Sequence, residues 1–384
     1  MSSSRRQLVL LGIGHTNAHV VRQWQSDPIP NCDLVCISKF PTATYSGMLP
    51  GTLGNQFNDA EWRIDLSTLC ERAGAKLILA ATNGLDLDMG LVKFESHESV
   101  RFDALSIGVG SMPAGWSEHA DQPSMVPIKP MQTFLQRLDT RLTERPIADG
   151  RPMQIAIVGG GVASVEIAFC LLQRLRSRFE TYPFSITIYT SDSSVAGGMT
   201  AASVRKIERL LSTRGIQVVP NQRVTNVAEA NLVLENGQTH LADVVIWATG
   251  ATAPPVLKKL GLEWDDRGFV ATSDTLQSLT DPRIFAVGDA GTILESPAPK
   301  AGVYAVRQSP ILSHNLRAFF ANESMQRFEP QSNFLKLLNT GDGKALLEYG
   351  RITVHAKWCW YLKNWIDQRF IRQFQESQQE SRIQ

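Results

Sequence analysis

A glycine-rich stretch near the middle of the chain constrains its fold most strongly. Residues 154–158 are apolar enough for a buried strand, Gly159-Gly160-Gly161 indicates a tight turn, and residues 162–168 begin a helix. This order brings backbone N–H groups at a helix N-terminus close to a bound pyrophosphate. One such turn is weak evidence, but a second, Gly12-Ile13-Gly14 after the apolar run 8–11, opens the chain. Two such turns predict two nucleotides, with electrons passing between them.

Both turns depart from the full dinucleotide fingerprint. The third glycine is replaced by Asn17 in the first turn and by Ser164 in the central one. The acid expected at the end of the second strand is replaced by Ser38 in the first unit, and in the second unit Asp192 lies two residues beyond Thr190. A carboxylate at that point would bind the ribose 2′-hydroxyl of NAD and repel the 2′-phosphate of NADP. The choice between NADH and NADPH therefore stays open.

Three further apolar strands end in glycine. Residues 102–111 and 242–250 share one pattern, and this echo predicts two domains of related plan. Residues 284–291 form a third strand, which ends in Gly288-Asp289. An aspartate at the carboxyl end of a parallel strand lies where such folds bind ligands. Its carboxylate could accept hydrogen bonds from the hydroxyls of a ribityl chain, or it could cap the following segment.

Composition and charge exclude some classes of function. Lysine and arginine total 38 against 37 for aspartate and glutamate, so there is no electrostatic reason to expect a nucleic-acid partner. The five cysteines form no CxxC pair and no zinc spacing, which predicts no metal site and favours a reducing compartment. The longest apolar passage, 155–172, contains three glycines, Ser164 and Glu166, and is a poor membrane span. We expect a cytoplasmic protein.

The C-terminal region reads as a hairpin followed by an amphipathic helix. The hairpin spans residues 335–347 around Gly341-Asp342-Gly343. The helix could lie on a membrane surface at the inner face of the plasma membrane, or cover the protein's own core or the partner of a homodimer. Its apolar stripe comprises Trp358, Tyr361, Leu362, Trp365, Ile366, Phe370 and Phe374, and its other face carries Lys357, Lys363, Asp367, Arg369 and Arg372.

Taken together, these marks resemble the two-dinucleotide-binding flavoproteins of the pyridine nucleotide–disulfide oxidoreductase superfamily. The likeness is closer to type II NADH dehydrogenases and sulfide:quinone oxidoreductases, and closer still to the flavoprotein fused to selenide, water dikinase. The motifs that carry it are Gly12-Ile13-Gly14-His15, Tyr45-Ser46-Gly47-Met48-Leu49-Pro50-Gly51, Lys129-Pro130, Gly159-Gly160-Gly161, Ala248-Thr249-Gly250, Val287-Gly288-Asp289, Pro299-Lys300-Ala301-Gly302 and Trp365-Ile366-Asp367-Gln368-Arg369-Phe370.

The resemblance implies an α/β fold with two Rossmann-like domains, glutathione reductase-like three-layer units that bind FAD and NAD(P)H. The FAD-binding domain would be discontinuous, over 1–120 and 276–325, with the NAD(P)H-binding domain at 121–275. The hairpin and amphipathic helix would occupy 326–384.

FAD would lie on the first turn, with Asp289 on its ribityl chain and residues 45–51 along the isoalloxazine. NAD(P)H would lie on the central turn, with Glu166 near the nicotinamide. Lys300, at the N-terminus of a helix that faces the flavin, is a candidate catalytic residue that would stabilise the negative charge of the reduced ring; Glu166 and Lys129 are the others. The expected cofactor contacts are Gly12, Gly14, His15, Ser38, Lys39, Ser46, Gly47, Gly110, Gly159, Gly161, Ser164, Gly250, Gly288, Asp289 and Ala301.

Disulfide reductases of this superfamily carry a CxxxxC motif that is absent after Tyr45, and Cys170 and Cys359 match no thiol position of the sulfide:quinone enzymes. The main hypothesis is therefore an FAD-dependent NAD(P)H oxidoreductase that passes electrons to a quinone or another small acceptor. One alternative is an FAD-bearing redox sensor or partner subunit in selenium metabolism. Another is oxidation of sulfide or selenide, which needs a nucleophilic thiol beside the flavin.

Overall fold

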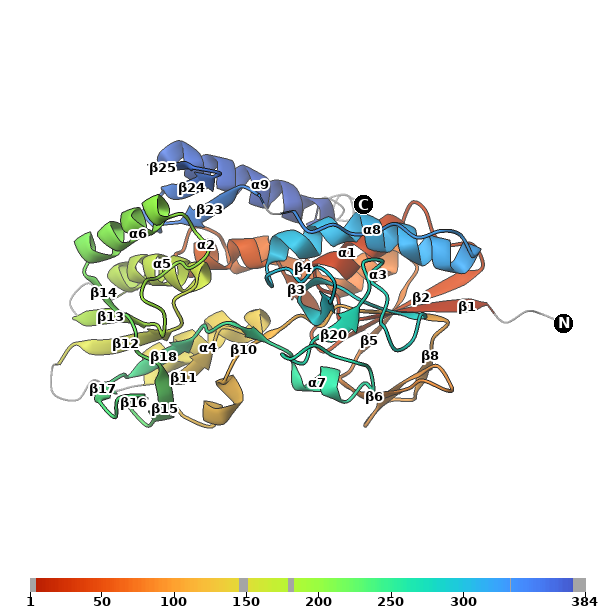
Figure 1. Cartoon of the computed structure of the whole chain (residues 1–384), viewed down its shortest axis with the longest axis horizontal. Helices are drawn as coiled ribbons and strands as arrows, with labels where there is room; N and C mark the ends of the chain where they lie inside the picture. The colour runs from red at the N-terminus through yellow and green to blue at the C-terminus, as the bar shows by residue number, and fades with distance from the viewer. Residues whose placement is uncertain (1–4, 145–150, 179–182, 332, 376–384) are drawn as a thin grey trace, which may run out of the picture.

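The computed structural model describes residues 5–144, 151–178, 183–331 and 333–375, and two parallel sheets organise them (Figure 1). The first sheet has the order β21-β9-β1-β2-β5. Residues 8–11 of its central strand are at most 3% exposed, as expected for a parallel sheet covered on both faces. We call this sheet and its helices the first α/β unit. Its main elements are β1 (Arg6–Leu11), α1 (His15–Trp24), β2 (Cys32–Ser38), α3 (Leu66–Arg72), β5 (Lys76–Leu79), β9 (Ala104–Ile107), β21 (Ile284–Ala286) and α8 (Gly302–Ala321).

The second sheet has the equivalent order β11-β18-β12-β13-β14, and with its helices it forms the second α/β unit. The central strand, β12, pairs in parallel with β13 on one side and β18 on the other. The elements of this unit are β11 (Met125–Pro127), α4 (Met131–Glu144), β12 (Met153–Val158), α5 (Val162–Arg178), β13 (Phe184–Tyr189), α6 (Ala201–Thr213), β14 (Ile216–Val219) and β18 (Val244–Trp247). The prediction of two Rossmann-like units is confirmed, whereas the exact domain boundaries stay a prediction.

The two units repeat one another in hydrogen-bonding detail. Before β9, the carboxylate of Asp103 accepts from the backbone N–H of Gln7 at 2.7 Å, and its own N–H donates to the Gln7 carbonyl at 2.8 Å. Before β18, Asp243 makes the same two bonds with Gln154, at 2.8 and 2.7 Å. The echo between the two sequence segments therefore corresponds to two copies of one strand pairing.

The chain crosses between the units twice, and the two crossings lie side by side. Strand β10 (Met112–Pro113) leads toward the second unit and β19 (Ala251–Thr252) leads back, and the two pair antiparallel. Each unit also carries a small antiparallel sheet. The remaining elements are β3 (Thr42–Thr44), α2 (Leu49–Leu53), β4 (Arg63–Asp65), β6 (Thr82–Asp86), β7 (Leu91–Phe94), β8 (Val100–Arg101), β15 (Val224–Ala228), β16 (Asn231–Leu234), β17 (Thr239–Leu241), α7 (Pro255–Lys258), β20 (Val270–Thr272) and β22 (Gly291–Ile293).

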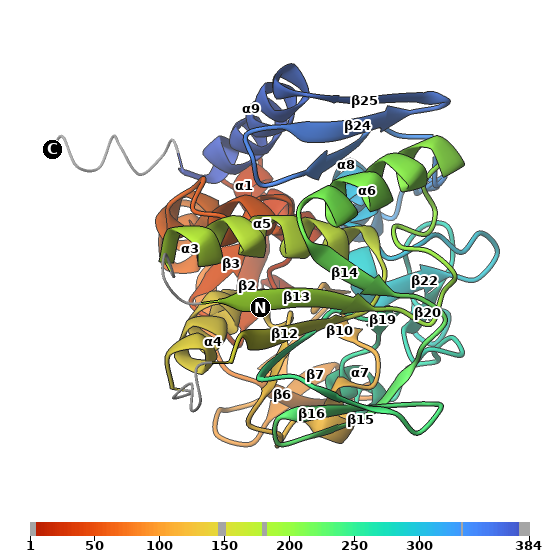
Figure 2. The same ribbon diagram turned by 90° about the vertical axis from the view of Figure 1, so that its left-hand side faces the viewer.

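The C-terminal unit consists of a three-stranded antiparallel sheet and a long helix, and it lies across both α/β units (Figures 1 and 2). The expected hairpin around residues 341–343 is present, but a third strand extends it. Its elements are β23 (Lys336–Asn339), β24 (Ala345–Tyr349), β25 (Ile352–Ala356) and α9 (Lys357–Gln375).

Helix α9 is rotated relative to the orientation expected from its sequence. Lys363 and Asp367, assigned to the polar face, are only 8% and 4% exposed. Part of the apolar stripe instead points to solvent, with Trp358, Tyr361 and Trp365 each more than half exposed. Burial is tolerated because the two charged side chains pair with each other, Lys363 Nζ lying 2.8 Å from Asp367 Oδ2.

Candidate functional site

The first glycine turn connects β1 to α1 and is bordered closely by backbone. Gly12 has a φ of 80°, and a Cβ atom there would lie 2.8 Å from backbone atoms of Gly108 and Val109. Gly14 is the N-cap of α1, whose first turn carries no acidic side chain. The backbone N–H groups at the N-terminus of α1 therefore face a turn in which the close backbone contacts admit only glycine. This arrangement suits a pyrophosphate.

Asn17, which replaces the third glycine, is fully buried and ties the turn to β9. Its Nδ2 donates to the carbonyl of Gly12 at 2.8 Å and to that of Ser106 at 3.2 Å. Its Oδ1 accepts from Ser106 Oγ at 2.7 Å. The substitution therefore adds hydrogen bonds to the turn without disrupting it.

The central turn follows the same plan. Gly159 has a φ of 121°, and a Cβ there would lie 2.3 Å from the carbonyl oxygen of Ala248. Ser164 donates its hydroxyl to that same carbonyl at 3.1 Å, so the serine is accommodated with a satisfied hydrogen bond. Open space surrounds Gly161 and Gly250. The turn thus leaves room for a second pyrophosphate at the N-terminus of α5.

Asp289 lies just beyond β21, where it forms an ion pair at the edge of the first sheet. Its Oδ2 is 3.1 Å from Lys129 Nζ and accepts from Ser111 Oγ at 2.6 Å. Burial alone would raise the pKa of this carboxyl, but Lys129 and Ser111 outweigh burial and lower it. A charged carboxylate at this edge can accept hydrogen bonds from ligand hydroxyls, as the ribityl prediction requires.

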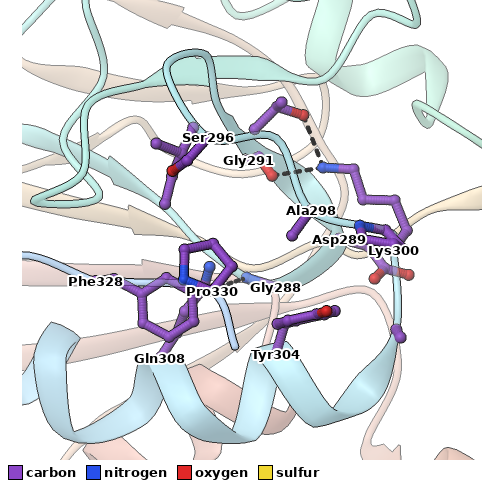
Figure 3. A pocket seen from close by; sticks show the side chains of 14 residues that line it. Gly288, Asp289, Gly291, Ser296, Ala298, Lys300, Tyr304, Gln308, Phe328 and Pro330 are labelled. Atoms are coloured by element: carbon purple, nitrogen blue, oxygen red, sulfur yellow. Dashed lines mark hydrogen bonds between the residues drawn. The ribbon is translucent and has the colours of Figure 1, made fainter. Parts of the chain in front are cut away.

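Lys300 lines a pocket between β22 and α8 (Figure 3). Its Nζ donates to the Gly291 carbonyl at 2.5 Å and to Thr292 Oγ1 at 2.8 Å, and lies 4.1 Å from the centre of the Phe269 ring. Burial lowers the pKa of Lys300 to about 8, although Asp289 opposes this. The ammonium group is thus held by the chain beside the pocket, and it is a weaker base than an exposed lysine.

Helix α8 itself begins next to this lysine and has no side-chain cap. Ala301 is the N-cap and provides no side-chain hydrogen bond, and the first turn contains no acid. Deeper in the helix, the Gln308 side chain accepts from the N–H of Gly288 at 2.6 Å. The helix end supplies positive potential beside Asp289.

The loop after β3 packs against α1 and α9 through aromatic rings. Tyr45 stacks on Phe370 with centroids 4.2 Å apart, and His15 meets Tyr45 edge-on at 5.5 Å. His15 Nε2 accepts from the N–H of Ser46 at 3.4 Å. Burial lowers the pKa of His15 to about 4, so its ring is neutral near pH 7.

A buried charged cluster lies where α5, α9 and this loop meet. Lys363 donates to Asp367 and, at 2.8 Å, to the carbonyl of Gly47. Burial alone would lower the pKa of Lys363, but Asp367 and Glu166 together raise it. Glu166 accepts from the N–H of Asn339 at 2.7 Å, and burial raises its pKa to about 7. The cluster therefore holds one fixed ion pair and one carboxyl that exchanges a proton near neutral pH.

The other residues expected to contact cofactors lie at the ends of first-unit strands. Ser38 closes β2 and donates its hydroxyl to the Phe40 carbonyl at 2.7 Å. Lys39 is exposed, with its Nζ 6.0 Å from the Phe40 ring centre. Gly110 has a φ of 78° and open space around it. These positions are compatible with contacts to a nucleotide, which stay a prediction.

The profile described as pyridine nucleotide-disulphide oxidoreductase matches residues 6–309. The chain belongs to this family. Such proteins typically bind FAD and NAD(P)H, and both glycine turns, together with Asp289, fit these two groups.

Several members of the pyridine nucleotide-disulphide oxidoreductase family are similar to this chain. The type II NADH:quinone oxidoreductase of Haemophilus influenzae is 24% identical over 56% of this chain and 52% of its own length. The demethylphylloquinone reductase of Synechocystis is 22% identical, over 89% and 87%. The chain spans only about half, or less, of the first curated relatives that it matches.

Two solved structures share the fold across almost the whole chain. The sulfide:quinone oxidoreductase of Aquifex aeolicus has a TM-score of 0.79 and 19% identity, over 97% of this chain and 92% of its own. The NADH complex of NDH2 from Plasmodium falciparum has a TM-score of 0.75 and 13% identity, over 96% and 98%. The resemblance to type II NADH dehydrogenases and sulfide:quinone oxidoreductases is confirmed. The narrower likeness to the selenide, water dikinase-fused flavoprotein stays a prediction.

The family name refers to a redox disulfide, but this chain has only free, buried cysteines. Burial, reinforced by Glu166, raises the pKa of the Cys170 thiol well above its usual value. A thiol that stays protonated is a poor nucleophile. The geometry therefore gives no support to sulfide or selenide oxidation through Cys170.

The sequence predicts Glu166, Lys129, Asp289 and Lys300 as site residues, and these assignments stay predictions. It does not predict that Lys363 and Asp367 are buried close enough to Glu166 to influence its pKa. The i, i+4 spacing of a lysine and an aspartate was the available signal. Such a pair is far more common on an exposed helix face, so spacing alone could not reveal its burial.

Proposed function

We propose that this protein is an FAD-dependent NAD(P)H dehydrogenase that passes electrons to a quinone or a similar small acceptor without a redox disulfide. The observation that carries the proposal is the buried Glu166–Lys363–Asp367 cluster beside the loop that contains Tyr45 and Gly47. Reduction of a quinone consumes protons as well as electrons. A carboxyl with a pKa near 7 at this position can supply a proton at neutral pH.

FAD, when bound, supplies the hydride and electron chemistry. The chain would hold it through the first glycine turn and Asp289, with the N-terminus of α8 directed at developing negative charge. Tyr45, His15 and Phe370 form a packed aromatic layer next to the same loop, which would exclude water from that side. NAD(P)H would lie along the central turn.

Lys300 is proposed to add to the positive potential at the N-terminus of α8. Lys300→Ala should slow flavin reduction or reoxidation about tenfold below pH 7, while FAD stays bound. Because the pKa of Lys300 is about 8, the wild-type ammonium loses its charge above that pH, and the difference between the two proteins should shrink. Stopped-flow absorbance between pH 6 and 9 measures it. An unchanged rate at pH 6 would remove Lys300 from the mechanism.

Anaerobic mixing with each nucleotide tests the proposed function directly. The purified protein should be yellow, and NADH or NADPH should bleach it; addition of a short-chain quinone should restore the colour. Protein that is colourless when purified and stays so after incubation with FAD would refute the assignment of cofactor. A yellow protein that neither nucleotide reduces would favour a sensor or partner subunit instead.

The exposed side of α9 supports a further part of the proposal, contact with a membrane surface. Trp358, Tyr361 and Trp365 share this side with Arg369, whose guanidinium lies 5.4 Å from the Trp365 ring. Aromatic and cationic residues together favour the membrane–water interface. No helix among the described residues is long and apolar enough to span a membrane. Contact would therefore be peripheral.

Changing Trp358 and Trp365 to serine should weaken binding to vesicles of anionic lipid at least tenfold, because about 2 kcal/mol of apolar burial per ring is lost. Cosedimentation measures the effect. Trp264, half exposed on the first unit, provides the control when changed to serine. The surface would instead be a contact with a second copy if the wild-type protein does not bind vesicles, elutes as a dimer, and becomes monomeric in the double variant.

A further inference from the structure

The C-terminal sheet holds α6 of the second α/β unit at the N-terminus of the helix. Glu348, on β24, accepts hydrogen bonds from the backbone N–H and the hydroxyl of Thr200, at 2.8 and 2.9 Å. Thr200 is the N-cap of α6. Lys336, on β23, completes the contact by donating to Glu348 at 2.9 Å and to the carbonyl of Gly198 at 2.7 Å.

The same sheet holds the other end of α6. Arg214, directly after the helix, donates to the Thr340 carbonyl and to Asp342 Oδ2, the latter at 2.8 Å. A carboxylate at the N-terminus and a cation at the C-terminus are the charges that a helix dipole favours. Burial alone would raise the pKa of Glu348, but its hydrogen bonds lower the pKa to about 2. This contact therefore keeps its charge at every physiological pH.

The C-terminal unit also makes direct hydrogen bonds to the first α/β unit. Asn339 Nδ2 donates to Gln56 Oε1 at 2.6 Å, and Gln56 Nε2 donates to the Gly341 carbonyl at 3.2 Å. On α9, Lys363 donates to the carbonyl of Gly47. Asn339 reaches both units, because its backbone N–H donates to Glu166 on α5.

We propose that the C-terminal sheet is a brace that sets the orientation of the second α/β unit toward the first, with Glu348 as its positioning residue. Two adjacent crossings, β10 and β19, connect the units along the chain, and α5 also contacts the loop after α2 directly, with Arg174 donating to Asn55 at 2.9 Å. The C-terminal sheet adds a third connection, and relative motion of domains is restricted where their shared interface is large. Hydride transfer is sensitive to misplacement on the scale of 1 Å. The inference rests on the proposed function for its catalytic consequence, but not for the orientation itself.

Glu348→Gln keeps the shape of the side chain and removes its charge, so it tests the brace. Hydride transfer from NADH to the flavin should slow by about tenfold or more. Reduction by dithionite, which does not need the second unit, should keep the wild-type rate, and FAD content should not change. Arg214→Lys should also slow hydride transfer, because Arg214 connects the other end of α6 to the C-terminal sheet. Asp281→Asn, which removes a carboxylate paired with Arg283 inside the first unit, is the matched control.

A distance measurement keeps the test independent of catalysis. Spin labels on Lys93→Cys and Asn236→Cys, exposed positions in the first and second units, report the separation of the units, since the five native cysteines are buried. Wild-type protein should give one narrow distance distribution, and Glu348→Gln should broaden or shift it. An unchanged distribution overturns the brace, even if neither nucleotide reduces the protein. Equal slowing of the dithionite and NADH reactions would show a purely structural role and also overturn the proposal.

Discussion

Asp289→Ala should be purified largely without flavin and should bind added FAD at least tenfold more weakly than the wild type. The carboxylate is charged and mostly buried, with Lys129 at 3.1 Å and Ser111 at 2.6 Å. A hydrogen bond from a ligand hydroxyl to such a group contributes about 1.5–3 kcal/mol, which corresponds to a factor of about 10 to 150 in affinity. Removal also leaves the Lys129 ammonium without its carboxylate. FAD fluorescence quenching during titration measures the dissociation constant.

Asp86→Ala is the control for this prediction. Asp86 pairs with Lys93 at 2.8 Å on the antiparallel sheet of the same unit, away from the carboxyl edge of the parallel sheet. This variant should retain FAD. If Asp289→Ala binds FAD as tightly as the wild type, the carboxylate serves only to pair with Lys129 and Ser111.

Glu166→Gln should reduce the rate of flavin reoxidation by a quinone about a hundredfold at pH 6, the usual contribution of a general acid. Burial raises the pKa of Glu166 from 4.5 to about 7, so the wild-type residue carries its proton below pH 7 and loses it as the pH rises. The wild-type rate should therefore fall above pH 7, and the glutamine variant should show no inflection there. Stopped-flow reoxidation from pH 5.5 to 8.5 resolves both effects.

The same pKa shift predicts a difference in stability with a defined sign. Between pH 4.5 and 7 the folded protein holds a proton on Glu166 that the unfolded chain releases. The contribution of this group to the free energy of unfolding is fully present below pH 4.5 and is lost as the pH rises through 7. The loss is roughly 3 kcal/mol at most. Relative to Glu166→Gln, the wild-type free energy of unfolding should fall across that window. Glu235→Gln, in an exposed turn, is the control and should have the wild-type rate and stability. If the pH–rate profile of Glu166→Gln still bends near pH 7, the titrating group is not Glu166.

The nucleotide-binding architecture was predictable because it depends on local patterns. Apolar strands followed by Gly12-Ile13-Gly14 and Gly159-Gly160-Gly161 specify strand, turn and helix within about fifteen residues. Local patterns did not predict the roles of Asn17 and Ser164. Each departs from the fingerprint, yet each donates a hydrogen bond to a carbonyl that is distant in sequence, Asn17 to Ser106 and Ser164 to Ala248.

The sequence predicts Glu166 as a site residue, but the charged cluster around it could not be predicted in the same way, because it forms between segments far apart in sequence. Glu166 and Lys363 are separated by almost two hundred residues, and the raised pKa of Glu166 arises from burial that no local pattern records. The orientation of α9 is a related case. Hydrophobicity favoured burial of Trp358 and Trp365, but the buried face of the helix carries the Lys363–Asp367 ion pair together with Phe370 and Phe374.

The antiparallel pair β10–β19 has a consequence for engineering. Pro113 opposes Ala251 and Met112 opposes Thr252, so the segment between them enters and leaves the first α/β unit at one point. A segment with adjacent ends can be exchanged as a cassette. Grafting a homologous central segment of different nucleotide preference at this junction should change the electron donor while the acceptor chemistry is retained, provided that the graft keeps Lys129 and Glu166 for the proposed site and Thr200 and Arg214 for the C-terminal sheet.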